Sequence, residues 1–238
     1  MRLVLTGAAA MLAALSLAAP ARADEPPSGH DFPLPPEGTP PPGWGLHSGD
    51  TVPRGDVLLY GELGWPDLSL GFQRGVGDNL DVGLRLSVSL GVDYIIPRDR
   101  NGVEDLSLGF GFSVPIRVRV YNNEKISVLV HADPGIKFEY LTPKPFFGPQ
   151  IPVGIDLGVH VSPRTTVTLG LDVPFLFRVT PDPTGIIPFL AGVSVERRFT
   201  DHFGMSVNLR PGILYGVNRT GSSVDLALLS QLGFFGRI

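Results

Sequence analysis

The feature that most constrains the fold is a strict alternation of apolar and polar residues over long stretches of the chain. Because successive side chains of a β-strand point to opposite faces, a period of two indicates strands with one apolar and one polar face. The residues between the apolar positions are charged, small and polar, or glycine. The pattern is clearest in residues 79–95, where the apolar positions are Leu80, Val82, Leu84, Leu86, Val88, Leu90, Val92 and Tyr94.

The first 23 residues have the features of a secretory signal peptide. Met1-Arg2 is a short basic start, Leu3–Leu17 is mostly apolar, and Ala21-Arg22-Ala23 is a small-x-small cleavage site, so Asp24 is expected to begin the mature protein. A transmembrane anchor is the alternative. The apolar run is short for an anchor, and no cluster of stop-transfer charges follows it.

Export and two-sided strands together predict an all-β, transmembrane, antiparallel up-and-down β-barrel. No apolar run of about 18 residues, the length of a membrane-spanning helix, follows the leader. In a soluble sandwich the apolar faces would turn inward. In an outer-membrane barrel they face lipid while the polar faces line the interior. We therefore expect a barrel over residues 54–238 in the outer membrane, with the lipid bilayer as its partner.

The alternation predicts about ten strands joined by connections of two kinds. Tight turns and longer loops alternate along the chain, as periplasmic turns and outer loops do in such barrels, and an even strand number places both termini in the periplasm. Trp65-Pro66 is the exception, a very short outer connection. The longer predicted loops are Pro97–Glu104, Leu141–Pro149, Thr180–Gly185 and Gly216–Ser222. The predicted strands are 56–64, 67–74, 79–95, 105–120, 125–140, 150–161, 165–179, 186–199, 203–215 and 223–236.

Prolines within the predicted strands argue against a simple barrel, because a closed barrel has no free edge and proline removes a ladder donor. Pro134-Gly135-Ile136 and Pro211-Gly212-Ile213 repeat one tripeptide, which we interpret as bulges that tighten curvature. If the prolines break strands instead, the strand number changes. The prolines concerned are Pro115, Pro134, Pro152, Pro174, Pro188 and Pro211.

Residues 24–53 are predicted to be a proline-rich periplasmic linker. Nine prolines between Pro26 and Pro53 favour extended polyproline conformation and leave little to build a core. We interpret the segment as a disordered arm. A short plug or a peptidoglycan-contacting arm is the alternative.

The inward faces carry charges of both signs, which predicts a lumen closed by pairing. Opposite charges on neighbouring strands can pair, and unpaired charges inside a narrow barrel would be costly. We therefore expect a non-enzymatic protein with a plugged lumen and a structural or surface role. A narrow channel for ions or small solutes, weakly cation-preferring, is the alternative. The predicted lumen-lining residues are Glu62, Asp81, Arg85, Asp93, Arg117, Arg119, His131, Asp133, Lys137, Asp156, Asp172, Arg178, Glu196, Arg198, Asn208, Arg210 and Gln231.

Composition and motifs exclude several other functions. The chain has no cysteine, so disulfides, thiolate metal sites and cysteine nucleophiles are absent. None of the five histidines reaches the predicted outer rim, so no catalytic residues are assigned. No metal-ligand spacing or cofactor motif appears, and no cofactor is expected. The net charge of −4, without a Lys/Arg-rich block, argues against nucleic-acid binding.

Residues 56–238 resemble the small outer-membrane β-barrel proteins of diderm bacteria. The resemblance is carried by the leader, the alternating strands, the segment Gly61–Phe72 and the last strand, Gln231-Leu232-Gly233-Phe234-Phe235. It implies that the barrel-assembly machinery and periplasmic chaperones are partners during biogenesis. The chain departs from the pattern at its end, where Ile238 replaces the usual terminal aromatic residue.

Overall fold

Every regular element in the described part of the chain is a β-strand. The computed structural model describes residues 44–90, 108–140, 145–179, 184–218 and 221–238. The strands are β1 (Val57–Trp65), β2 (Asp67–Gly77), β3 (Leu80–Leu90), β4 (Leu108–Ser113), β5 (Ile116–Asn122), β6 (Ile126–Ala132), β7 (Gly135–Glu139), β8 (Phe146–Ser162), β9 (Thr165–Arg178), β10 (Thr184–Arg198), β11 (Phe203–Asn218) and β12 (Gly221–Arg237).

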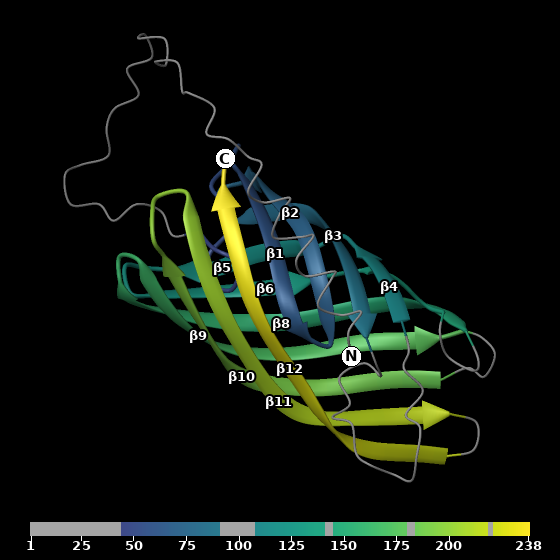
Figure 1. The fold of residues 1–238 in the computed structure, drawn as a ribbon. Helices are drawn as coiled ribbons and strands as arrows, with labels where there is room; N and C mark the ends of the chain where they lie inside the picture. Colours follow the sequence, from purple (N-terminus) through teal and green to yellow (C-terminus); the bar gives the residue numbers. More distant parts are fainter. Residues whose placement is uncertain (1–43, 91–107, 141–144, 180–183, 219–220) are drawn as a thin grey trace, which may run out of the picture. The chain divides into compact units, whose positions relative to one another are not determined.

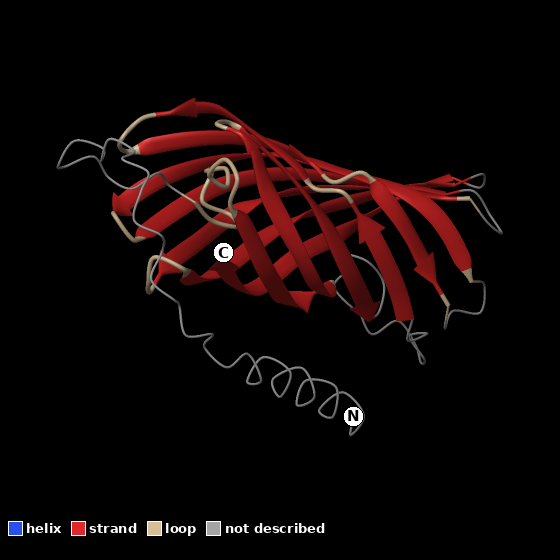
Figure 2. Ribbon diagram, turned by 90° about the horizontal axis from the view of Figure 1, so that it is seen from above, coloured by secondary structure: helices blue, strands red, loops and turns tan. Residues whose placement is uncertain are grey.

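These elements form one closed antiparallel barrel of ten strands (Figure 1), as the alternation predicts. The segments β4 and β5 make up one barrel strand, and β6 and β7 make up the next, because β4–β7 and β5–β6 pair in a common register. The barrel closes because β1 pairs with both β2 and β12. Figure 2 shows the near and far walls crossing at a large angle, as tilted barrel strands do.

One end of the barrel, called the turn end below, has four tight turns and both ends of the paired chain. The turns follow β2, β5, β8 and β10, and the backbone N–H of Val57 bonds to the carbonyl of Ile238 at 2.9 Å. The opposite end is called the loop end. Strands β8–β12 have 14 to 17 residues and β1–β3 have 9 to 11, so the β8–β12 wall is taller (Figure 1).

The two faces of the strands divide as predicted. In β3, Leu84 and Leu86 are exposed on the outside of the barrel, with Leu86 60% exposed, while Asp81 is fully buried inside. A closed sheet with a continuous apolar exterior suits lipid rather than water. The outermost apolar side chains include Leu59, Leu70, Phe110, Phe112, Leu169, Leu171, Phe189, Val207, Ile213 and Leu226.

Prolines occur in six successive barrel strands, and none of these prolines shifts the register. The β6–β8 pairing ends at Ala132↔Val153 and resumes in the same register as Gly135↔Gln150, so the chain passes Pro134 without inserting a residue. The pairing of β11 with β12 likewise runs unbroken through Pro211. The bulge interpretation of the two repeated tripeptides is therefore wrong. Proline removes a donor but leaves the backbone extended, and the strand number stays at ten.

Three register shifts do occur, all beside turns, at Gly75/Gly77, Arg119/Tyr121 and His160/Ser162. Two predicted loops are also shorter than expected. Strand β8 begins at Phe146, and only two residues separate β11 from β12. The predicted loop Pro97–Glu104 lies outside the described residues.

The interior of the turn end is filled by residues 44–53, called the N-terminal segment below. Every residue from Trp44 to Val52 is buried except His47, which is half-buried. This stretch is the described part of the predicted linker, and it is packed among inward-facing barrel side chains. Residues 1–43, with the predicted signal peptide, lie outside the described residues.

Candidate functional site

The N-terminal segment is held by an ion pair on the barrel wall. Arg117 on β5 binds the carboxylate of Asp81 on β3 through two bonds, of 2.8 and 2.7 Å. The free Nη1 of Arg117 donates to the carbonyls of Gly45 and Leu46, at 2.9 and 2.8 Å. Asp81 accepts the backbone N–H of Val52 at 2.8 Å. One ion pair thus binds both halves of the segment.

Other barrel side chains satisfy the remaining backbone groups of the segment. Glu196 on β10 accepts the N–H groups of Leu46 and His47, at 2.8 and 2.9 Å. Ser127 on β6 donates to the carbonyl of Ser48 at 3.1 Å. The approach is so close that a Cβ on Gly45 would lie 1.6 Å from Oε1 of Glu196. Buried backbone groups must be paired, and here the barrel lumen supplies the partners.

Aromatic and cationic side chains fix the beginning of the segment. Trp44 is 2% exposed and meets Phe235 on β12 edge to face, with ring centroids 5.6 Å apart. The guanidinium groups of Arg198 and Arg237 lie 5.7 and 5.1 Å from the centroid of the Trp44 ring. Edge-to-face packing and cation–π contacts both favour a docked indole.

Asp50 is the electrostatically strained residue of the segment. It is 1% exposed, and neither of its carboxylate oxygens has a hydrogen-bond partner among the described residues. His160 and Arg119 are the nearest positive groups, at 3.6 and 3.9 Å. Burial raises the pKa of Asp50 above its ordinary value, an effect that His160 and then Arg119 oppose. Docking of the segment is therefore sensitive to the charge on Asp50.

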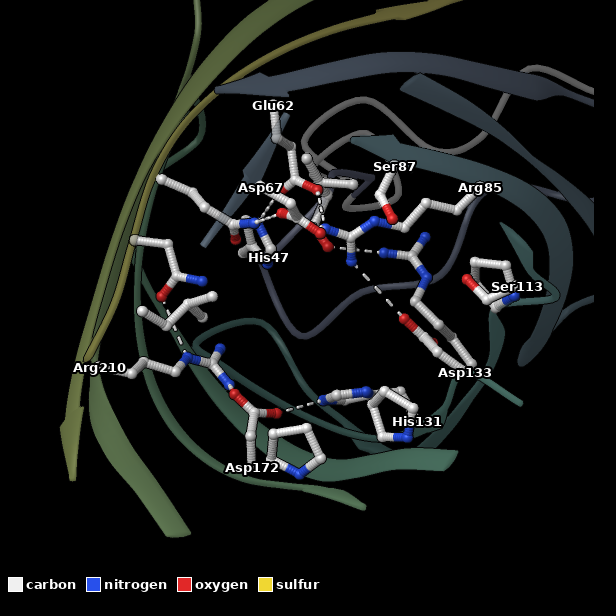
Figure 3. Close-up of a pocket in the computed structure, with 18 of the residues that line it drawn as sticks. His47, Glu62, Asp67, Arg85, Ser87, Ser113, His131, Asp133, Asp172 and Arg210 are labelled. Carbon is white, nitrogen blue, oxygen red and sulfur yellow. Dashed lines mark hydrogen bonds and ion pairs between the residues drawn. The ribbon is translucent and has the colours of Figure 1, made fainter. Parts of the chain in front are cut away.

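A cavity of about 120 Å³ lies on the other side of the segment, with Leu46 and His47 in its floor. Figure 3 shows two charge clusters facing each other across it. In the first, Arg85 lies 3.3 Å from Glu62, 3.4 Å from Asp67 and 3.8 Å from Asp133. His47 joins this cluster, because its Nε2 lies 2.9 Å from Oε1 of Glu62.

The second cluster is centred on Arg210 of β11. Its guanidinium binds Asp156 at 2.7 Å, makes a very short contact with Asp172, and donates to Asn208 at 3.0 Å. Nε2 of His131 lies 3.1 Å from Asp172 and 3.7 Å from Asp156. Each guanidinium is therefore shared between two or more carboxylates, and the charges cross-link strands around the lumen.

Part of the lumen is apolar, which differs from the predicted polar interior. A cluster of inward-facing apolar side chains lies on β9–β12, and Leu190 and Leu229 bring its edge to the cavity. The prolines Pro115, Pro152 and Pro174 also line the cavity. The lumen thus has an apolar wall beside its charged wall. The cluster consists of Leu176, Ile186, Leu190, Leu214 and Ala227, with Leu229 packed against it.

The predicted lumen-lining residues fall into three groups in the structure. Those lining the cavity are Glu62, Arg85, Arg117, His131, Asp133, Asp156, Asp172, Asn208, Arg210 and Gln231. Those beside the N-terminal segment are Asp81, Arg119, Glu196 and Arg198. Lys137 and Arg178 lie 3.7 and 3.9 Å from Glu139, toward the loop end. Asp93 lies outside the described residues.

Sequence reasoning missed the contribution of the segment itself, namely Trp44, His47 and Asp50. A signal was present, because the run of prolines stops at Pro42 and is followed by tryptophan, leucine, histidine and valine within ten residues. Such a change in composition marks chain that is able to pack.

Within the described ranges, no three histidine, aspartate or glutamate residues are grouped so that they could hold a metal ion. In those same ranges, no helix has the length and apolarity needed to cross a membrane.

No family model matches the chain, and no curated protein matches it. Several solved structures are similar to it, and two of them are described here. One is the "TodX monoaromatic hydrocarbon channel deltaS2 mutant", 10% identical, with 80% of this chain and 72% of that chain covered and a TM-score of 0.36. The other is OmpT, an outer membrane protein of Vibrio cholerae folded in vitro, 12% identical, with 81% and 67% covered and a TM-score of 0.33. These similarities carry no information about activity.

Proposed function

We propose that this protein is a non-enzymatic integral outer-membrane β-barrel whose lumen is plugged at the turn end by its own N-terminal segment. The observation that carries the proposal is the bidentate Arg117–Asp81 pair, which binds Gly45, Leu46 and Val52 of that segment. A barrel side-chain pair devoted to the backbone of another segment is costly unless that segment is normally in place.

The outer-membrane location is supported by the apolar exterior of the closed barrel and by the predicted signal peptide. If the tight turns lie on the periplasmic side, as expected for an outer-membrane barrel, the turn end with Val57 and Ile238 faces the periplasm. The N-terminal segment then enters the lumen from that side. The last strand, β12, would then be read by the assembly machinery with Phe234 and Phe235 near its end.

A non-catalytic role is supported by the way the imidazoles are used. His131 and His47 contact carboxylates in the cavity. His160 contacts the hydroxyl of Thr166 at 3.1 Å, but Thr166 is 5% exposed and lies apart from the residues that line the cavity. A nucleophilic hydroxyl must be within reach of both its base and a substrate, and this arrangement offers no such access.

A narrow channel for ions or small solutes is the second candidate. The observation that favours it is the cavity, which continues the lumen beyond the segment and is lined by charges of both signs. The N-terminal segment takes no part in the paired ladder, and an isolated bridge lies just after it at Arg54, so the segment could leave without opening the barrel wall.

Single-channel conductance in a planar bilayer tests the proposal. The refolded wild type should be silent, and a variant lacking residues 44–53 should conduct. A matched variant lacking residues 26–35, in the part of the predicted linker before the segment, should stay silent. Conductance by the wild type would overturn the plugged-barrel proposal in favour of the channel. A silent variant lacking residues 44–53 would show that the segment is not what closes the lumen.

A further inference from the structure

The cavity has more carboxylates than cationic groups to balance them. Among the described residues that line it are five carboxylates and three guanidinium groups. One of those guanidiniums, Arg117, is occupied by Asp81, which lies below the cavity and is fully buried. Two guanidinium groups, on Arg85 and Arg210, and the imidazoles of His47 and His131 remain for the five carboxylates. The carboxylates are Glu62, Asp67, Asp133, Asp156 and Asp172.

The shortage of positively charged partners is greatest at Asp133. Its carboxylate is 3.8 Å from Arg85, which also contacts Glu62 and Asp67 at shorter distances. Figure 3 shows Asp133 between the two charge clusters and close to His131. A carboxylate in a low-dielectric lumen that shares its counter-charges with other carboxylates attracts a further cation that can reach it.

A second, independent observation points to a ligand with hydrogen-bond donors. The side chain of Gln73 lines the same cavity and is 3% exposed, and its amide oxygen has no hydrogen-bond partner among the described residues. A buried, unpaired acceptor costs free energy unless a water or a ligand supplies the missing donor.

The apolar wall decides which kind of cation fits. Leu190, Leu229 and Pro174 line the cavity, Leu190 is the cross-strand partner of Asp172, and Leu190 continues into the buried apolar cluster of β9–β12. A hydrated metal ion gains nothing from such a wall, whereas the hydrocarbon part of an organic cation does. The volume of about 120 Å³ is slightly below that of an engineered cavity of about 150 Å³ that holds benzene.

We propose that the lumenal cavity is a binding site for a small organic monocation, a protonated amine carrying one ring or a short alkyl chain. The ammonium group lies between Asp133 and Asp172, and the apolar part packs on Leu190 and Leu229. Because the site lies on the loop-end side of the segment, the ligand can be held while the turn end stays closed. The inference thus goes beyond the plugged barrel and does not depend on it.

Isothermal titration calorimetry on the full-length protein, refolded in detergent, tests the site with three probes that share a benzene ring and differ in charge. Benzylammonium should bind at least about tenfold more tightly than neutral benzyl alcohol, and benzoate should show no binding. Methylammonium, which has the positive charge but no ring, should bind more weakly than benzylammonium. This comparison uses the wild type alone, so it does not depend on any variant folding.

Variants then locate the site. Asp133→Asn should weaken benzylammonium binding about tenfold, whereas Asp201→Asn, on an exposed turn, should leave it unchanged. Equal affinities for benzylammonium and benzyl alcohol, absence of any binding, or full binding by the Asp133→Asn variant would each overturn the proposal. None of these results would alter the conductance test, so a failure here is distinct from a failure of the plugged barrel.

Discussion

Arg117 and Asp81 form a bidentate ion pair between β5 and β3, and together they bind the N-terminal segment at Leu46 and Val52. The two residues are 36 positions apart in the sequence, yet their strands are neighbours. Neither partner is exposed, so their charges compensate each other only while both are present. The pair therefore links the integrity of the barrel wall to the occupancy of its lumen.

Asp81→Asn should release the N-terminal segment. It leaves the Arg117 guanidinium without its counter-charge and weakens the acceptor for the Val52 N–H, at a cost of roughly 3 kcal/mol. Because the chain has no cysteine, a single Ser48→Cys change provides a clean probe: Ser48 is 2% exposed, so maleimide labelling reports release. The labelling rate should rise at least about tenfold in Asp81→Asn. Asp201→Asn, on an exposed turn, should leave the labelling rate unchanged. Equal rates in the Ser48→Cys parent and in both variants would show that the Arg117–Asp81 pair does not hold the segment.

Phe235→Ala should loosen the same segment through its apolar contact. The edge of the Trp44 ring would lose its partner, and truncation of a buried phenylalanine costs roughly 3 kcal/mol. The chain has two tryptophans, so in a Trp65→Phe background Trp44 is the only tryptophan and can be excited selectively at wavelengths where tyrosine does not absorb. Its emission should shift to the red in Phe235→Ala. Phe234→Ala, whose side chain points to the other face of β12, is the matched control and should leave the emission unchanged.

The strand number and the two faces of each strand could be predicted because the information is local. Leu84 and Leu86 on one side and Asp81 on the other need only the two-residue period of a strand. The same rule also predicts the apolar patch of the lumen. Leu176 is an even number of residues from Asp172 and Arg178, so it lies on the same face of β9. The prediction of a wholly polar interior overlooked that spacing.

The sequence offered a short plug only as an alternative to a disordered arm, and the two could not be distinguished in the same way. Residues 44–53 have no regular period, and their burial depends on partners from distant strands, such as Arg117 and Glu196. Inward-facing charges predicted pairing among themselves, and nothing in their spacing indicated that several serve the backbone of another segment. The prolines present a similar case. Pro134 predicted a bulge from its missing donor, but its neighbouring strands keep their register and absorb the loss.

Docking of the segment should weaken as the pH rises through the raised pKa of Asp50. Burial raises that pKa above the ordinary value of 3.8, so the docked state favours the protonated carboxyl. The contribution of Asp50 to docking is therefore fully present below about pH 3.8 and is lost as the pH increases through the raised pKa. Trp44 emission in the Trp65→Phe background should follow this loss. Asp50→Asn should remove that part of the pH dependence, and an unchanged profile in Asp50→Asn would show that other groups cause it.

Leu86→Arg and Ser87→Arg should have unequal effects on insertion, because adjacent positions of β3 face opposite sides of the barrel. Leu86 is 60% exposed on the apolar exterior, and Arg at the middle of the bilayer costs roughly 2–4 kcal/mol. Ser87 lines the cavity, where the surplus of carboxylates can accept a further guanidinium. The folded fraction after refolding into lipid vesicles, scored by the gel-mobility difference between unboiled and boiled samples, should fall for Leu86→Arg and stay near wild type for Ser87→Arg. Equal losses in the two variants would mean that the assignment of inner and outer faces is wrong.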